Sequence, residues 1–194
     1  MGMSTAELAE VIAQVGGSPL PVGTGNWPAW AQTFDRRLAT GAVLTPTTQL
    51  AYYTAIWLPG GALVTGISFV TVGAETTGAH WFNAIHRGDT LALLGQSTDN
   101  TSTTAILANA VLRGALATAV TLPYSGLYYL SFCANFSSAP TLVCANTGSI
   151  NLNGNITGMT PVLSAVSVGT YTTTAPNPAV LSTPNVTLLY GFVD

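Results

Sequence analysis

Residues 49–58 read QLAYYTAIWL, the turn Pro59-Gly60-Gly61 follows, and residues 63–72 read LVTGISFVTV. Both runs are rich in aromatic and β-branched residues, which are enriched in strands. A proline followed by two glycines is a turn signal. This stretch therefore predicts a β-hairpin, and the rest of the chain repeats its pattern.

Similar signals recur downstream. The runs HWFNAIHR (80–87) and TLALLGQS (90–97) flank a Gly88-Asp89 turn and predict a second hairpin. Short strands separated by glycine and proline, without alternating long helices, indicate an all-β protein, an antiparallel jelly-roll-like β-sandwich. Further strands are expected at residues 116–122, 126–136, 141–145 and 186–193.

The first forty residues differ from this pattern. Ser4 and Glu7 have the spacing of a capping box, which begins a helix, and Gly16-Gly17 ends it. A helix of about twelve residues is marginal alone in water, so its apolar side must pack against something. That side consists of residues at helical spacing: Leu8, Val11, Ile12 and Val15.

A connector rich in glycine and proline, residues 17–28, leads into Trp27, Trp30 and Phe34. Tryptophan is enriched at protein interfaces. Two interpretations stay open: this segment folds onto its own β-domain, or it docks onto another subunit. The second makes residues 1–40 an N-terminal helix and linker anchor and residues 41–194 the β-sandwich domain. The anchor residues would then be Leu8, Val11, Ile12, Val15, Trp27, Trp30 and Phe34.

Residues 146–185 form a long polar insertion before the closing strand, rich in threonine, asparagine, glycine, serine and proline. Most connections in compact domains are much shorter, and long ones are usually functional. We expect this insertion to have a function or to be shaped by a neighbouring molecule.

The composition argues against several classes of protein. Only 6% of the 194 residues are charged, and the formal net charge is −3. Binding to nucleic acid depends on clustered lysine and arginine, so no nucleic-acid partner is expected. The most apolar stretch, residues 105–120, is short and contains Asn109, Arg113 and Gly114, so no membrane span is expected.

The sequence contains few titratable residues that could act as catalytic acids or bases. His80 and His86 would lie ~20 Å apart on one strand, too far to bind one metal ion. The seven carboxylates are scattered along the chain. We therefore predict no catalytic residues, no cofactor, no metal and no enzyme, with glycan hydrolysis as a distant alternative. Arg87-Gly88-Asp89 is an RGD tripeptide, but it falls where the second hairpin needs a turn.

Two further patterns concern packing and binding. Aromatic residues on strands alternate between faces, so about half should be core. The others could stack on sugar rings or fill a subunit interface, and a core or interface role is favoured. The candidates for stacking on sugar rings are Tyr53, Trp57 and Trp81. Cys133 and Cys144 would be directly opposite if 132–136 and 141–145 formed a hairpin, which would allow a disulfide. Two buried free thiols are the favoured alternative.

The order of several short motifs resembles a β-sandwich family found in virion and tail-associated proteins of phages that infect actinobacteria. The resemblance covers residues 34–145 and none of its motifs is catalytic. The motifs are Arg36-Arg37-Leu38-Ala39, residues 55–61 (AIWLPGG), 64–69 (VTGISF), His80-Trp81-Phe82, 124–129 (YSGLYY) and 139–142 (APTL).

The resemblance implies a structural protein of a tailed-phage virion, a minor tail module at the tail tip or fibre that could contact the host surface. A capsid decoration protein is the alternative within the same class. A carbohydrate-binding module for host envelope glycan is the alternative from another class. Other virion subunits are the implied partners, and similar phage modules imply a homo-oligomer, a trimer.

Overall fold

The computed structural model describes residues 31–35, 38–39, 43–75, 80–100, 106–146, 162–184 and 187–194. The expected N-terminal helix and the predicted anchor residues Leu8, Val11, Ile12, Val15, Trp27 and Trp30 lie outside these ranges. Residues 147–161, the first part of the polar insertion, lie outside them as well.

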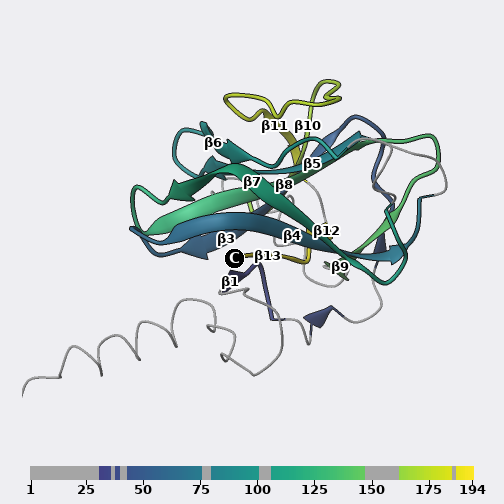
Figure 1. Ribbon diagram of the computed structural model, residues 1–194, viewed down its shortest axis with the longest axis horizontal. Coiled ribbons are helices and arrows are strands. Elements are labelled where there is room, and N and C mark those ends of the chain that lie inside the picture. The colour runs from purple at the N-terminus through teal and green to yellow at the C-terminus, as the bar shows by residue number, and fades with distance from the viewer. Residues whose placement is uncertain are drawn as a thin grey trace, which may run out of the picture.

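Within the described residues, the chain forms two antiparallel sheets packed face to face (Figure 1). The predicted all-β antiparallel sandwich is confirmed. One sheet has seven strands: β1 (Ala31–Gln32), β2 (Val43–Leu44), β4 (Leu63–Gly73), β7 (Val111–Thr121), β9 (Thr141–Asn146), β12 (Thr187–Leu189) and β13 (Gly191–Val193). The other has six: β3 (Ala51–Leu58), β5 (His80–Arg87), β6 (Leu93–Gln96), β8 (Gly126–Asn135), β10 (Ser164–Ser167) and β11 (Leu181–Pro184).

The main core lies between the sheets. Alternation along β3 sends Tyr52, Ile56 and Leu58 into this core, where all three are buried. Across the interface, Phe69 of β4 meets Phe132 of β8 edge to face, with ring centroids 5.9 Å apart. Such aromatic contacts add to the free energy gained by burying the rings.

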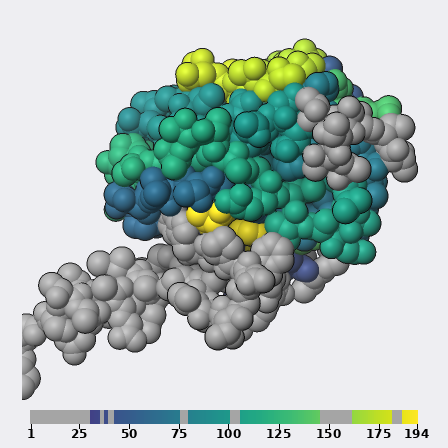
Figure 2. Space-filling model, viewed as in Figure 1, coloured from purple at the N-terminus to yellow at the C-terminus, as the bar shows by residue number. Residues whose placement is uncertain are grey.

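The opposite face of the six-stranded sheet is also covered. Residues 168–180, which connect β10 to β11 and are named the strap here, lie across this face (Figures 1 and 2, yellow-green). Ala175 and Ala179 of the strap pack in one buried cluster with Tyr53, Tyr129 and Cys133. Both faces of the central strands are therefore buried, and the later part of the polar insertion packs on its own domain.

The predicted strands are present with shifted ends. The expected strand at 116–122 is β7, which begins earlier, at Val111. The expected strand at 186–193 is divided at Tyr190 into β12 and β13. The division arises because the chain changes partner there: β12 pairs with β9, whereas β13 pairs with β4.

The hairpin that would place Cys133 and Cys144 opposite each other does not form. β8, with Cys133, pairs with β3 and β5 in the six-stranded sheet, whereas β9, with Cys144, belongs to the seven-stranded sheet. Cys133 packs under the strap and Cys144 packs in the core between the sheets. Both are buried free thiols, as favoured from the sequence.

The sandwich begins upstream of the expected boundary at residue 40. β1 pairs with β13, matching Ala31 with Val193. The ring of Phe34 packs edge to face on Tyr190, with centroids 5.4 Å apart. Residues 31–34 therefore contact the sandwich itself, and Phe34 is held on its own domain.

Candidate functional site

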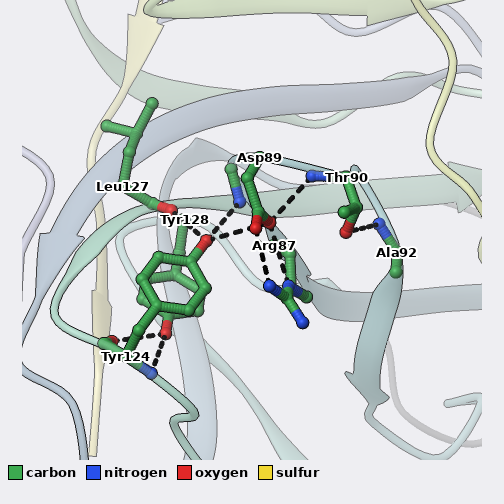
Figure 3. Close-up of polar contacts among 8 residues, drawn as sticks. Arg87, Asp89, Thr90, Ala92, Tyr124, Leu127 and Tyr128 are labelled. Atoms are coloured by element: carbon green, nitrogen blue, oxygen red, sulfur yellow. Dashed lines mark hydrogen bonds and ion pairs between the residues drawn. The ribbon is translucent and has the colours of Figure 1, made fainter.

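The turn between β5 and β6 carries an exposed ion pair (Figure 3). Arg87 Nε donates to Asp89 Oδ1 at 2.9 Å, and Arg87 Nη2 donates to Asp89 Oδ2 at 2.6 Å. The backbone N–H of Thr90 also donates to Asp89 Oδ1 at 2.8 Å. The turn predicted at Gly88-Asp89 is confirmed, and its two charged side chains close on each other.

Tyr124, from the turn before β8, completes this arrangement, and we name Arg87, Gly88, Asp89 and Tyr124 the turn cluster. The Tyr124 hydroxyl donates to Asp89 Oδ1 at 3.2 Å and accepts from the Gly88 N–H at 3.2 Å (Figure 3). The Arg87 guanidinium carbon lies 5.1 Å from the centre of the Tyr124 ring, a cation–π distance.

Glycine is required at position 88 because the backbone of β8 approaches closely. A Cβ atom there would lie 2.3 Å from the carbonyl oxygen of Leu127. The Gly88 N–H donates to that same oxygen at 3.0 Å. The turn cluster is therefore held against the beginning of β8.

The electrostatics of the turn cluster follow from its ion pair. Hydrogen bonds from Arg87 hold the pKa of Asp89 well below its usual range, and the same contact raises the pKa of Arg87. Both side chains are partly exposed, so water screens the pair and its contribution to stability is small. The bidentate contact occupies both charged side chains of the RGD tripeptide, which favours the turn interpretation over receptor binding.

The three candidate stacking residues have different environments. Tyr53 and Trp81 have exposed fractions of 0% and 3%, so neither ring can stack on a sugar at the surface. Alternation places Tyr53 under the strap and Trp81 in the core between the sheets. Trp57 is 58% exposed. It pairs with Leu127, the residue that contacts Gly88, so Trp57 lies at the same end of the sandwich as the turn cluster.

The two histidines occupy opposite ends of β5, and the structure does not bring them together. His80 Nδ1 lies 2.6 Å from Asp99 Oδ2 at a partly exposed site. His86 is fully buried beneath the strap. Among the residues that the structure describes, no group of three or more His, Cys, Asp or Glu side chains is placed to hold a metal ion.

One buried polar residue, Asn83, was not singled out from the sequence, and the segment that buries His86 could not be located from it. Asn83 lies in the core between the sheets, where its Nδ2 donates to the carbonyl oxygens of Ile67 (2.8 Å) and Leu112 (3.2 Å) in the opposite sheet. Its only sequence signal is an amide within the apolar run HWFNAI. His86 likewise interrupts an apolar strand, but its covering segment lies ninety residues away in sequence.

In the described part of the chain, no helix is long and apolar enough to cross a bilayer. The fold and these sites define an antiparallel β-sandwich protein with an internal strap and an aromatic, ion-paired turn end. No protein-family model matches the chain, and no curated protein matches it significantly.

Proposed function

We propose that this chain is a structural protein of a tailed-phage virion, a minor tail module at the tail tip or fibre. The observation that carries the proposal is an unusually uncharged surface bearing large apolar side chains. The apolar residues that the structure leaves substantially exposed are Leu38, Val43, Trp57, Leu63, Val72, Leu107, Val168 and Val180.

Charged side chains contribute little to the solubility of this surface. Arg113 is paired with Asp194, and Arg87 is paired with Asp89. Exposed Val43 and Val72 lie on one sheet, because β2 and β4 both pair with β9. Larger exposed apolar areas commonly mark contacts with other proteins. A protein built into a particle would remove this surface from water, in a homo-oligomer, a trimer, or against other virion subunits.

The anchor interpretation supports the same proposal. The chain enters the sandwich at β1, which lies at an edge of the seven-stranded sheet. Residues 1–30 precede this strand and carry the predicted apolar helix face together with Trp27 and Trp30. Attached there, an anchor would hold the sandwich at the particle surface. A capsid decoration protein would use the same arrangement, and the two differ only in their place on the virion.

Deletion of residues 1–30 should leave the β-sandwich folded but abolish its incorporation into phage particles. We expect the shortened chain to keep its fold because it still contains β1 and Phe34. Incorporation is measured by complementing a phage that lacks the gene and probing purified virions by immunoblot. Immunogold labelling of particles carrying the full chain then distinguishes tail from capsid. The proposal fails if the shortened, folded protein is incorporated at the normal level.

A second candidate function, binding of host envelope glycan, is favoured by one observation. Trp57 presents an exposed indole at the end of the sandwich that also carries the turn cluster. Exposed aromatic rings supply apolar contact area with a polar edge, which suits the faces of sugar rings.

Trp57→Ala should weaken binding of the purified protein to host cell-wall glycan by about tenfold or more, the loss of roughly 1.4 kcal/mol of binding free energy. Binding is measured by sedimentation with cell-wall fragments. Leu107→Ala is the matched control, because Leu107 is similarly exposed, and it should bind as the wild type does. Absence of saturable binding by the wild type would exclude this second function and leave the structural role.

A further inference from the structure

The strap is held on the six-stranded sheet by a set of directed hydrogen bonds. Backbone N–H groups of the strap donate from Tyr171 to Gln49 O (2.8 Å), from Ala179 to Leu91 O (2.7 Å) and from Ala175 to Gln96 Oε1 (2.6 Å). In the other direction, Gln96 Nε2 donates to Thr173 O at 2.7 Å, and the Leu93 N–H donates to Asn177 Oδ1 at 3.0 Å.

Two contacts from the sheet to the strap involve titratable groups: the Cys133 thiol of β8 donates to Tyr171 O at 3.3 Å, and His86 of β5 contacts Pro176. His86 Nε2 lies 3.2 Å from the carbonyl oxygen of Pro176, and the histidine is 0% exposed. Because a carbonyl oxygen only accepts hydrogen bonds, Nε2 carries the proton in the neutral ring. The other nitrogen, Nδ1, is then an unprotonated acceptor, and it is buried with no hydrogen-bond partner in the described part of the chain.

Among the residues that the structure describes, the groups packed around His86 carry no negative charge. The Tyr53 ring of β3 meets the imidazole edge to face at 5.5 Å, and Tyr129 of β8 is the cross-strand partner of His86. Cys133 of β8 and Tyr171 of the strap belong to the same buried cluster. Burial raises the pKa of Tyr53 and Tyr129, and it raises the pKa of the Cys133 thiol to about 12. These three groups are therefore neutral at and below neutral pH.

We propose that the strap is an acid-released cover for the six-stranded sheet, and that His86 is the residue that responds to pH. A proton added at Nδ1 would place a positive charge in an apolar layer with no acceptor for the new N–H. Burying an unpaired charge is costly. Lifting the strap breaks the contact with Pro176 and admits water to the imidazolium, so acid favours the open form. This inference does not depend on the proposed virion role.

The direction and size of the effect follow from linkage. Burial lowers the pKa of His86 from 6.5 to about 4. As pH falls below 6.5, the open form takes up a proton that the closed form excludes, so closure loses stability down to about pH 4, and the loss levels off below that pH because the closed form is then protonated as well. With an ordinary pKa in the open form, the opening equilibrium should rise about twentyfold from pH 7 to pH 5 and about a hundredfold from pH 7 to pH 4.

Hydrogen exchange of the full-length protein tests the proposal. The strap amides of Ala175 and Ala179 report opening, and the amide of Leu130 in β8 reports global unfolding. Opening constants are obtained between pH 7 and pH 4 after correction for the intrinsic pH dependence of exchange. The opening constants of the two strap amides should rise with falling pH by the factors given above. The opening constant of the Leu130 amide should stay much smaller. Equal constants for the strap and β8 would mean global unfolding and would overturn the proposal.

Two variants assign the effect to its residue. His86→Gln keeps a side-chain N–H donor for Pro176 but cannot titrate, so strap opening should become nearly independent of pH. His80→Gln removes the partly exposed histidine of the same strand and should behave as the wild type does. An unchanged pH dependence in His86→Gln would refute the assignment. If that variant fails to fold, an NMR titration of wild-type His86 decides, and a pKa above 6 would overturn the proposal.

Discussion

Asn83→Asp should lower the free energy of unfolding by about 3–5 kcal/mol at pH 7, the cost of leaving an uncompensated charge buried. The Asn83 amide donates to Ile67 O and Leu112 O across the interface between the sheets, and the residue is 0% exposed. A carboxylate of the same shape has no proton to donate and would face two carbonyl oxygens. The change therefore combines lost hydrogen bonds with electrostatic repulsion.

The loss of stability caused by Asn83→Asp should be larger at pH 7 than at pH 4. Burial raises the pKa of the introduced carboxyl in the folded state above its unfolded value, so the folded state binds the proton more tightly. The destabilisation relative to wild type is therefore full above the raised pKa and shrinks as pH falls towards the ordinary value near 4. Urea denaturation of both proteins at pH 7 and at pH 4 measures the difference.

Asn177→Asp is the matched control for this substitution. Asn177 is exposed in the strap, and its Oδ1 accepts from the Leu93 N–H, which a carboxylate oxygen also does. That change should stay within about 0.5 kcal/mol of wild type, as surface substitutions usually do. A loss below about 1 kcal/mol for Asn83→Asp at pH 7 would contradict the role given to the amide in joining the sheets.

Phe132→Ala should lower the free energy of unfolding by about 3–5 kcal/mol, the range for removing a large aromatic side chain from a well-packed core. Phe132 is fully buried and meets Phe69 of the other sheet, so its removal leaves a cavity between the two sheets. Guanidinium denaturation measures the change. Val180→Ala, at a site 46% exposed, should cost much less. Equal losses for the two variants would mean that the core does not depend on this aromatic contact.

The local elements were predictable because their signals lie within a few residues. Aromatic and β-branched runs located β3, β4, β5 and β8. Glycine with proline or aspartate located the turn from β3 to β4 and the turn from β5 to β6. The RGD tripeptide was read correctly as a turn, because glycine and aspartate are typical turn residues. Only the structure shows that the close approach of the β8 backbone also requires glycine at position 88. The burial of both cysteines followed from their apolar strands. The ends of β6 and β7 shifted by a few residues, since fraying and pairing partners set strand ends.

The pairing of distant segments was decided only in the tertiary structure. The sequence allowed a hairpin that would place Cys133 opposite Cys144, but β8 pairs with β3 and β5, and Cys144 lies on β9 in the other sheet. Period-2 alternation showed that Tyr53 and Trp57 share a face, yet only the strap, more than a hundred residues away, determines that Tyr53 is buried and Trp57 exposed. The strap likewise covers His86 and leaves its Nδ1 buried without a hydrogen-bond partner among the described residues. Alternation and turn chemistry are properties of neighbouring residues, whereas cover, burial and hydrogen-bond partners depend on which remote segment packs on each face.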